Sequence, residues 1–303
     1  MRNHRLRRCC LSVPGSREDM LEKARQIEID QIVIDWEDAV APDQKQRARE
    51  VTLAALADPW EASSVSVRIN GLETPHCLND VLAITQKRSD HGQAVESVVL
   101  PKTASTSQIH FVSTLLDQLS VDDDPMAPSN IEALIEDANG MINAHAIALA
   151  SPRLESLIFG MGDFAAAQGI QTTVIGDQSG YDADLWHYPR YRLIMAARAA
   201  NIAAIDGPFA AFKDVDGLNR DCRVARLMGM NGKWAVHPGQ AETIAAHFTP
   251  SQSQVDQARK QKKEFEKALK QGQGAVAVDG AMVDQASINL LEPLLADAEL
   301  LGM

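Results

Sequence analysis

The sequence predicts a (β/α)8 barrel with a small C-terminal α/β lid subdomain. Eight short apolar or β-branched runs recur along the first part of the 303-residue chain, and amphipathic stretches separate most of them. Nearly continuous apolar strands that alternate with helices are typical of a parallel sheet covered on both faces. Eight such units within about 240 residues fit a closed barrel better than an open doubly wound sheet.

The strands and helices follow one another in a regular order. Runs rich in Val, Ile and Leu predict strands at residues 9–15, 31–38, 64–70, 97–102, 131–137, 154–163, 202–207 and 233–238. Apolar residues at helical spacing predict helices at residues 17–29, 42–57, 76–88, 106–119, 141–150, 191–201 and 215–229. Residues 1–248 therefore form the predicted catalytic barrel.

The character of the chain changes after residue 248. Residues 251–271 form a highly charged helical stretch, and residues 272–284 read as two short strands around the turn pair Asp279-Gly280. A last helix is expected from about residue 285, interrupted or kinked at Pro293. We interpret residues 249–303 as a lid, or as an arm that reaches a neighbouring subunit.

Charge and composition restrict the partners. The net charge is −12, which disfavours binding to nucleic acid or to an anionic membrane surface and favours a small-molecule ligand. No apolar run approaches the roughly 18 residues of a membrane helix, and the basic N-terminus lacks a signal-peptide apolar region. Four cysteines without C-x-x-C spacing form neither a disulfide framework nor a zinc cluster, so we expect a cytoplasmic protein.

Most of the predicted strands end on a polar or charged residue. The carboxyl ends of all strands of such a barrel meet at one mouth, where the active site lies. We therefore expect the acids at the strand ends to lie at the mouth and not in the packed interior. The residues concerned are Asp35, Glu37, Asp38, Arg68, Asn70, Lys102, Glu136, Asp163, Asp206 and His237.

Glu136 and Asp163 stand at the ends of neighbouring strands and suggest a metal site. Two carboxylates without a nearby His or Cys cluster suit Mg²⁺, which takes oxygen ligands and completes its shell with water and substrate oxygens. The alternative is that both are helix N-caps or first-turn acids favoured by the helix dipole. Spacing by itself leaves both interpretations open.

Other charged residues also have two interpretations. The planar fork of Arg68 can hold a substrate carboxylate in two parallel hydrogen bonds, or form an ion pair with Glu37 or Asp38. Lys102 has the same two roles, with a buried ion pair as the alternative. Glu37 and Asp38 are expected to orient a metal-bound water, Arg68 or Lys102, because unpaired buried charge costs several kcal/mol.

Asp284 and His237 are less specific signals. Asp284 precedes the last predicted helix, so an N-cap is its simplest role. His237 stands before Pro238, where it either contacts a ligand or completes the end of the last strand. The sequence has no nucleophile–histidine–acid order, Gly-rich phosphate loop or dinucleotide fingerprint.

An ordered set of motifs nonetheless resembles a known family. R-x-x-L-x-V-P-G begins at Arg8, D-x-E-D-A-V at Asp35, P-D-x-K at Pro42, V-R-I-N at Val67 and L-P-K at Leu100. I-E-x-A-x-G, F-G-x-x-D, D-G, G-K-W-A-V-H-P and M-V-D follow at residues 135–140, 159–163, 206–207, 232–238 and 282–284. In this order they resemble the citrate lyase β-subunit-like branch of the HpcH/HpaI aldolase family across nearly the whole chain.

The resemblance implies a TIM barrel with a C-terminal lid, assembled as a homotrimer or hexamer. It implies Mg²⁺-dependent cleavage or formation of a carbon–carbon bond in a 3-hydroxyacyl-coenzyme A of the malyl-, citramalyl- or citryl-CoA type. By this resemblance Glu136 and Asp163 bind the metal and Arg68 grips the 2-oxo acid. Asp284 is the lid acid/base, and the turn at Pro14 and Gly15, with basic residues around the mouth, holds coenzyme A.

The chain also departs from the family pattern. Ser12 stands where phenylalanine is usual, Trp36 where leucine is common, and Asp137 where threonine or serine usually follows the metal-binding Glu. The extra charge of Asp137 would either point toward solvent or tune metal affinity. Two other functions stay open: a malyl-CoA-type thioesterase, and the β subunit of a multi-subunit citrate lyase acting on a carrier-bound thioester.

Overall fold

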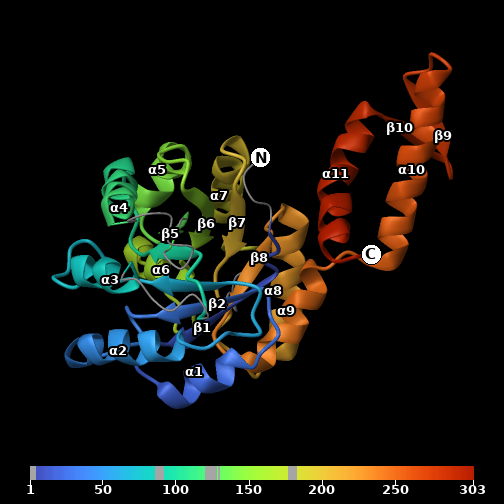
Figure 1. Ribbon diagram of the computed structural model, residues 1–303. Coiled ribbons are helices and arrows are strands. Elements are labelled where there is room, and N and C mark those ends of the chain that lie inside the picture. The colour runs from blue at the N-terminus through green and yellow to red at the C-terminus, as the bar shows by residue number, and fades with distance from the viewer. Residues whose placement is uncertain (1–4, 86–91, 120–127, 129, 177–182) are drawn as a thin grey trace. The chain divides into compact units, whose positions relative to one another are not determined.

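Within the residues that the computed structural model describes, 5–85, 92–119, 128, 130–176 and 183–303, eight parallel strands close into a barrel in the order β1 to β8. The last strand pairs with the first, so the sheet has no free edge. Helices surround the strands, as Figure 1 shows. The predicted (β/α)8 TIM barrel is confirmed.

The elements alternate along the chain as the hydrophobic pattern predicts. The strands are β1 (Cys9–Pro14), β2 (Gln31–Asp35), β3 (Val65–Arg68), β4 (Ser97–Leu100), β5 (Asn130–Ile135), β6 (Leu154–Phe159), β7 (Ala203–Asp206) and β8 (Gly232–Ala235). The helices are α1 (Glu18–Arg25), α2 (Lys45–Ala55), α3 (Cys77–Ile84), α4 (Thr106–Leu119), α5 (Ala138–Ala148), α6 (Met161–Gln168), α7 (His187–Ala199), α8 (Val215–Met228) and α9 (Ala241–Phe248). Short 3₁₀ helices, η1 (Pro42–Gln44) and η2 (Pro238–Gln240), precede α2 and α9.

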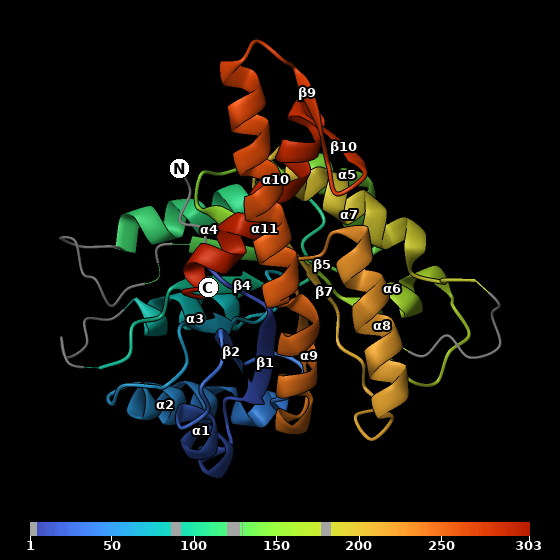
Figure 2. The same ribbon diagram turned by 90° about the vertical axis from the view of Figure 1, so that its right-hand side faces the viewer.

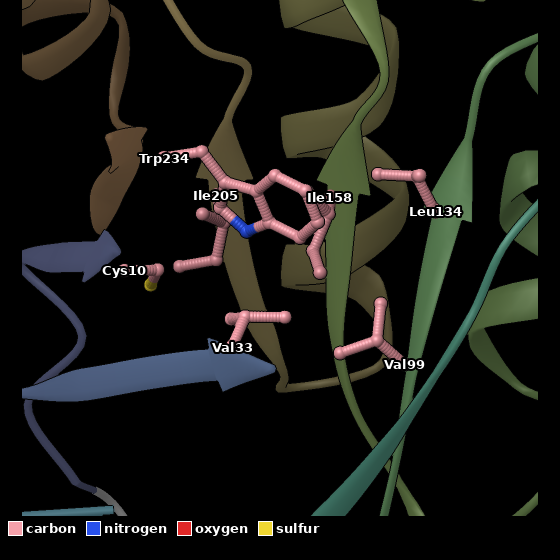
Figure 3. Packing of buried hydrophobic residues seen from close by; sticks show 7 residues of the cluster. All are labelled: Cys10, Val33, Val99, Leu134, Ile158, Ile205 and Trp234. Carbon is pink, nitrogen blue, oxygen red and sulfur yellow. The ribbon is translucent and has the colours of Figure 1, made fainter. Parts of the chain in front are cut away.

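A layer of apolar side chains fills the middle of the barrel. Figure 3 shows these side chains pointing toward one another from seven different strands. All are buried, so the barrel is a packed core without a pore. They are Cys10, Val33, Val99, Leu134, Ile158, Ile205 and Trp234.

A polar layer lies below this apolar layer, toward the amino ends of the strands. Successive inward side chains of a strand are two residues apart, so Glu132 lies one layer below Leu134. Its carboxylate accepts hydrogen bonds from Gln31 at 2.5 Å, Ser97 at 2.6 Å and Ser156 at 2.7 Å. These bonds offset the cost of burying a carboxylate inside the barrel.

The same two-residue period places polar side chains above the apolar layer. Asp35 follows Val33 by two positions, Glu136 follows Leu134, and Ser12 follows Cys10. All three are among the residues that line a cavity at the carboxyl ends of the strands. The apolar layer thus closes the floor of that cavity.

Some predicted element boundaries need correction. The predicted strand 154–163 ends at Phe159, and α6 begins at Met161, because Gly160 turns the chain into a helix there. The last helix runs from Gln285 to Leu300 through Pro293, so the expected interruption is wrong. Residues 86–88 of the helix predicted at 76–88 lie outside the described residues.

The chain divides into two compact units. Among the described residues, one comprises Arg7–Ala245 and the other Ala246–Met303 with Arg5 and Leu6. The second contains α10 (Gln252–Lys270), the antiparallel hairpin of β9 (Ala275–Val278) and β10 (Ala281–Asp284), and α11 (Gln285–Leu300). Both helices carry the hairpin at one end, which Figures 1 and 2 show from two sides. The core of this unit is Phe265, Val278, Val283 and Ile288.

No helix in the described part of the chain has both the length and the apolar character needed to cross a membrane.

The apolar layer should carry much of the stability of the barrel. Ile158 is 1% exposed and Ile142 is 64% exposed. We expect Ile158→Ala to lower the free energy of unfolding by about 2–5 kcal/mol, because it leaves a cavity in a packed interior. Ile142→Ala removes the same atoms from the surface and should change it by less than about 0.5 kcal/mol. Urea denaturation measures both, and equal losses would contradict this description of the core.

Candidate active site

A cavity of about 400 Å³ opens at the carboxyl ends of the barrel strands. Trp234 and Leu134 of the apolar layer form part of its lining, and charged groups lie above them. The polar and charged residues that line it are Ser12, Asp35, Asp38, Arg68, Glu136 and Asp163. Pro14 also lines it, whereas Glu37 and Lys102 contact its charged groups from the side.

Arg68 lies at the centre of an ion-pair network. Its register partner on β2 is Asp35, and the two side chains form a bidentate pair with N–O distances of 2.8 and 2.5 Å. Its Nη1 lies 3.0 Å from Glu37 and 3.4 Å from Asp38. Burial lowers the pKa of the guanidinium, but the carboxylates of Asp35 and Glu37 raise it more, so Arg68 stays charged.

Sequence reasoning identified Arg68 but missed Asp35 as its main partner. Asp35 is the last residue of a buried strand, and parallel register places it beside the end of the next strand, where Arg68 stands. That shared register position is the signal that could have revealed the pair. Trp234, also missed, has its ring centroid 5.7 Å from the Arg68 guanidinium.

Lys102 connects the β2 and β5 sides of the site. Its ammonium pairs closely with Glu37 and lies 3.8 Å from Asp38 and 3.7 Å from Asp163. Its backbone N–H donates to the Glu136 carboxylate at 2.6 Å, and its φ of 49° is the left-handed conformation. Burial lowers the pKa of the ammonium, but the contact with Glu37 raises it more. Lys102 is therefore a fixed positive charge.

Glu136 follows the last residue of β5 and is only 4% exposed. Gly160 allows this position, because a Cβ atom there would lie 2.4 Å from the Glu136 Cβ and 2.6 Å from its Oε2. The pKa of Glu136 is raised to about 8, mainly by burial and also by the charges of Glu37 and Asp163, although the Lys102 N–H and Arg68 lower it. The positive groups around Glu136 therefore do not fully offset the cost of burying its ionised carboxylate.

Asp163 lies in the first turn of α6, where the helix dipole favours a negative charge. Its side chain is 48% exposed, in contrast to that of Glu136, and the two line the same cavity. The first-turn position is one of the alternatives weighed from the sequence. It does not exclude metal binding, because Asp163 lines the same cavity as Glu136.

The carboxylate pair fits a hard divalent cation. No three His, Cys, Asp or Glu side chains gather as a metal-binding cluster among the described residues, so a bound ion would take two carboxylates and complete its shell with water and substrate oxygens. Mg²⁺ tolerates that ligand set. A cation near Glu136 would also offset the charge that burial makes costly.

The remaining predicted residues occupy defined positions. Asp137 caps α5 by accepting a hydrogen bond from the Gly140 N–H at 2.6 Å, which accounts for the extra charge beside Glu136. His237 caps η2 through the Gly239 N–H at 3.0 Å, and its ring stacks on Phe212 with centroids 4.7 Å apart.

Gly15 and Asp284 take part in local structure. A Cβ atom at Gly15 would lie 2.5 Å from the Trp36 indole, so the unusual tryptophan packs directly under the V-P-G turn. Asp284, in the C-terminal unit, caps α11 by accepting from the Ser287 N–H at 2.9 Å. This hydrogen bond lowers the pKa of the Asp284 carboxyl.

Asp206 requires a correction. The expectation that strand-end acids lie at the mouth is wrong here, because Asp206 is fully buried. It pairs with Arg190 of α7 at 2.9 Å and with Lys233 of β8 at 2.6 Å. Lys233 also donates to the Gly207 carbonyl at 2.5 Å, and so helps to hold the turn after β7.

The closed parallel barrel and the acidic cavity at the carboxyl ends of its strands define a TIM-barrel enzyme. A model of the HpcH/HpaI aldolase/citrate lyase family matches residues 8–238. The chain therefore belongs to the HpcH/HpaI aldolase/citrate lyase family, which confirms the resemblance seen in its motifs.

Three similar proteins are informative. The chain is 35% identical to an L-malyl-CoA/beta-methylmalyl-CoA lyase of Cereibacter sphaeroides, over 97% of this chain and 95% of that protein. It is 34% identical to a (3S)-malyl-CoA thioesterase of Cereibacter sphaeroides, over 96% and 94%. The solved structure of CitE from Mycobacterium tuberculosis in complex with magnesium, acetoacetate and coenzyme A matches with a TM-score of 0.74 and 27% identity, over 96% of this chain and 97% of that one.

The burial of Glu136 predicts a distinct pH dependence in protein stripped of divalent ions. Between the ordinary pKa near 4.5 and the raised pKa near 8, the folded protein keeps the Glu136 proton while the unfolded chain releases it. Stability should therefore fall as pH rises through this window, by about 1.4 kcal/mol per pH unit.

Glu136→Gln removes the ionisation and leaves an oxygen to accept the Lys102 N–H. Relative to this variant, the wild-type protein should lose unfolding free energy between pH 5 and pH 8 in EDTA, as measured by urea denaturation at each pH. Parallel pH profiles for the two proteins would contradict the raised pKa.

Proposed function

We propose that the protein is a Mg²⁺-dependent carbon–carbon lyase that cleaves or forms a 3-hydroxyacyl-coenzyme A, with an acyl-coenzyme A and a 2-oxo acid as its other reactants. The observation that carries the proposal is the pair Glu136 and Asp163 in one cavity with Arg68. Family membership and the similarity to a malyl-CoA/methylmalyl-CoA lyase over 97% of the chain support it.

Glu136 and Asp163 are the proposed metal ligands. When bound there, Mg²⁺ supplies a Lewis acid for the carbonyl and carboxylate of the 2-oxo acid. The CitE structure, which contains magnesium, acetoacetate and coenzyme A, supports this cofactor and the coenzyme A substrate. Glu37 and Asp38 hold Arg68 and Lys102 in place, and so keep the positive charges beside the carboxylate pair.

Arg68 is the proposed group that binds the substrate carboxylate. Asp35 holds Nε and Nη2, which fixes the plane of the guanidinium. Nη1 has the longer contacts, at 3.0 and 3.4 Å, and a substrate anion can replace those. Arginine suits this role because its donors match a carboxylate in geometry and it stays charged.

The thioester half of the substrate is assigned to four residues at and around the mouth of the cavity. Pro14 lines the cavity, and the turn that continues to Gly15 packs on the buried Trp36. Lys102 and His237 supply polar groups near this mouth. We assign these four residues, Pro14, Gly15, Lys102 and His237, to binding of the coenzyme A thioester and its acyl group.

Asp284 is the proposed acid/base, supported by its match to the M-V-D motif. In condensation it takes a proton from the α-carbon of the acyl-coenzyme A, and the resulting enolate forms the new bond to the carbonyl carbon of the 2-oxo acid. The carbonyl oxygen becomes a hydroxyl by taking up a proton. In cleavage the hydroxyl proton leaves, the bond breaks, and Asp284 returns a proton to the α-carbon.

The assembly and compartment belong to the same proposal. A cytoplasmic homotrimer or hexamer would allow the unit comprising residues 249–303 to act as a lid, on its own barrel or on that of a neighbouring subunit. A carboxylate base for so weak a carbon acid needs a closed, water-poor site, which is the reason for a lid. Sedimentation velocity of the full chain measures the assembly.

Product analysis tests the function. The chain should convert malyl- or citramalyl-coenzyme A, with Mg²⁺, to an acyl-coenzyme A and a 2-oxo acid in equal amounts. Glu136→Ala or Asp163→Ala should lower turnover at least about 100-fold and keep the melting temperature near that of the wild type. Full turnover after removal of Mg²⁺, or by either variant, would contradict the metal assignment.

A thioesterase is the second candidate, favoured by the 34% identity to a malyl-CoA thioesterase. Hydrolysis leaves free coenzyme A and intact malate, so the same assay separates the two reactions. A third outcome, no reaction with free coenzyme A esters but turnover when citrate lyase partner subunits and a carrier-bound thioester are added, would indicate the β subunit of a citrate lyase.

Asp284→Asn tests the proposed acid/base separately. Asparagine can still cap α11 through its side-chain oxygen, so the fold of the C-terminal unit should persist. We expect kcat to fall at least about 100-fold with KM nearly unchanged, since general acid–base catalysis contributes about 10²–10⁴-fold. An unchanged kcat would reduce Asp284 to its role as a helix cap.

A further inference from the structure

A second cavity, of about 330 Å³, adjoins the acidic one. We call it the annex. Met161, Gly162 and Ile175 line both cavities and form their common wall. The annex is lined by Met161, Gly162, Ala165, Ala166, Ile170, Thr172, Thr173, Val174, Ile175 and Trp186.

Ile175 forms part of this wall. Its carbonyl accepts a hydrogen bond from the Ala210 N–H at 2.9 Å, which fixes the backbone against the loop after β7. Its terminal Cδ1 lies over Gly162, where a Cβ atom would come within 2.9 Å of it. The side chain is 41% exposed, and it lines both cavities.

Large apolar side chains, Met161 and Trp186, line the annex together with the shorter side chains of Thr172 and Thr173. Trp186 is fully buried, and its ring meets the Phe159 ring edge-on at 5.9 Å between centroids. Met161 is also fully buried. The described residues that line the annex carry no charge, in contrast to the carboxylates and Arg68 of the neighbouring cavity.

The shared wall lies at the proposed metal end of the site, because Gly162 immediately precedes Asp163. We propose that it holds the alkyl substituent of the 2-oxo acid, so that the preferred 2-oxo acid carries a methyl or longer chain at the carbonyl in place of the hydrogen of glyoxylate. Ile175 sets the chain length. This inference rests on the proposed lyase function and specifies its substrate.

Two adjacent alanines of α6 allow a matched test. Ala166 lines the annex but not the acidic cavity, whereas Ala167 lines neither, and both are exposed. Ala166→Leu fills part of the annex, and Ala167→Leu makes the same chemical change outside it. Leucine suits a helix, so both variants should fold, with melting temperature as the check. Ile175→Ala opens the common wall.

The experiment measures condensation of acetyl-coenzyme A with glyoxylate, pyruvate, 2-oxobutyrate and 2-oxovalerate in the presence of Mg²⁺. The readout is kcat/KM for each 2-oxo acid relative to glyoxylate. Ala166→Leu should lower the 2-oxobutyrate ratio about tenfold and Ile175→Ala should raise it about tenfold, since one methylene group in an apolar pocket discriminates about 10–200-fold. Ala167→Leu should leave the 2-oxobutyrate ratio within about twofold of the wild-type value.

Calorimetric affinities of the same 2-oxo acids for the Mg²⁺-loaded protein should change in the same ratios. Failure of the wild-type protein to condense any 2-oxo acid would overturn the proposed function and this inference with it. Two results would overturn the inference and leave the lyase function intact. In the first, the protein condenses 2-oxo acids but Ala166→Leu and Ala167→Leu change the kcat/KM ratios equally. In the second, Ile175→Ala does not raise the 2-oxobutyrate ratio.

Discussion

The burial of one carboxylate, that of Glu136, is the constraint on which the site depends. Arg68 and Lys102 contact several carboxylates at the mouth, and both are already paired, with Asp35 and Glu37. Burial therefore raises the pKa of Glu136 to about 8. Such a group is costly to keep as a carboxylate, and the proposed divalent ion would offset that cost. The other features of the mouth follow from keeping that carboxylate in place.

The barrel achieves this placement by layering its interior. Side chains two residues apart on each strand occupy successive layers, so the hydrogen-bonded Glu132, the apolar Leu134 and the buried Glu136 stand one above another on β5. The apolar layer, shown in Figure 3, separates the two acids and excludes water from the floor of the site. Gly160 at the end of β6 leaves the space that Glu136 needs. The barrel fold supports many different reactions, and the side chains one layer above its apolar core determine the chemistry of the site.

Much of this could be predicted from the sequence. Eight apolar runs predicted the barrel, and their polar ends located the acids, because parallel strands share one mouth. The pairing of Arg68 with Asp35 was not predictable from spacing, since it depends on the register between two strands. Asp206 was misplaced because its partners Arg190 and Lys233 are distant in sequence, and only folding brings them together. The annex was not predictable from the sequence either, since its walls come from α6 and from the residues between α6 and α7.

The lyase proposal depends on one central claim, that Glu136 and Asp163 hold the same divalent ion and that this ion holds the 2-oxo acid. The most direct measurement is a crystal structure of the full chain with Mn²⁺ and pyruvate, in which anomalous scattering locates the ion. We predict one peak within coordination distance of a carboxylate oxygen of each residue and of two pyruvate oxygens. An ion elsewhere, or a pyruvate bound with neither carboxylate coordinating metal, would contradict the claim.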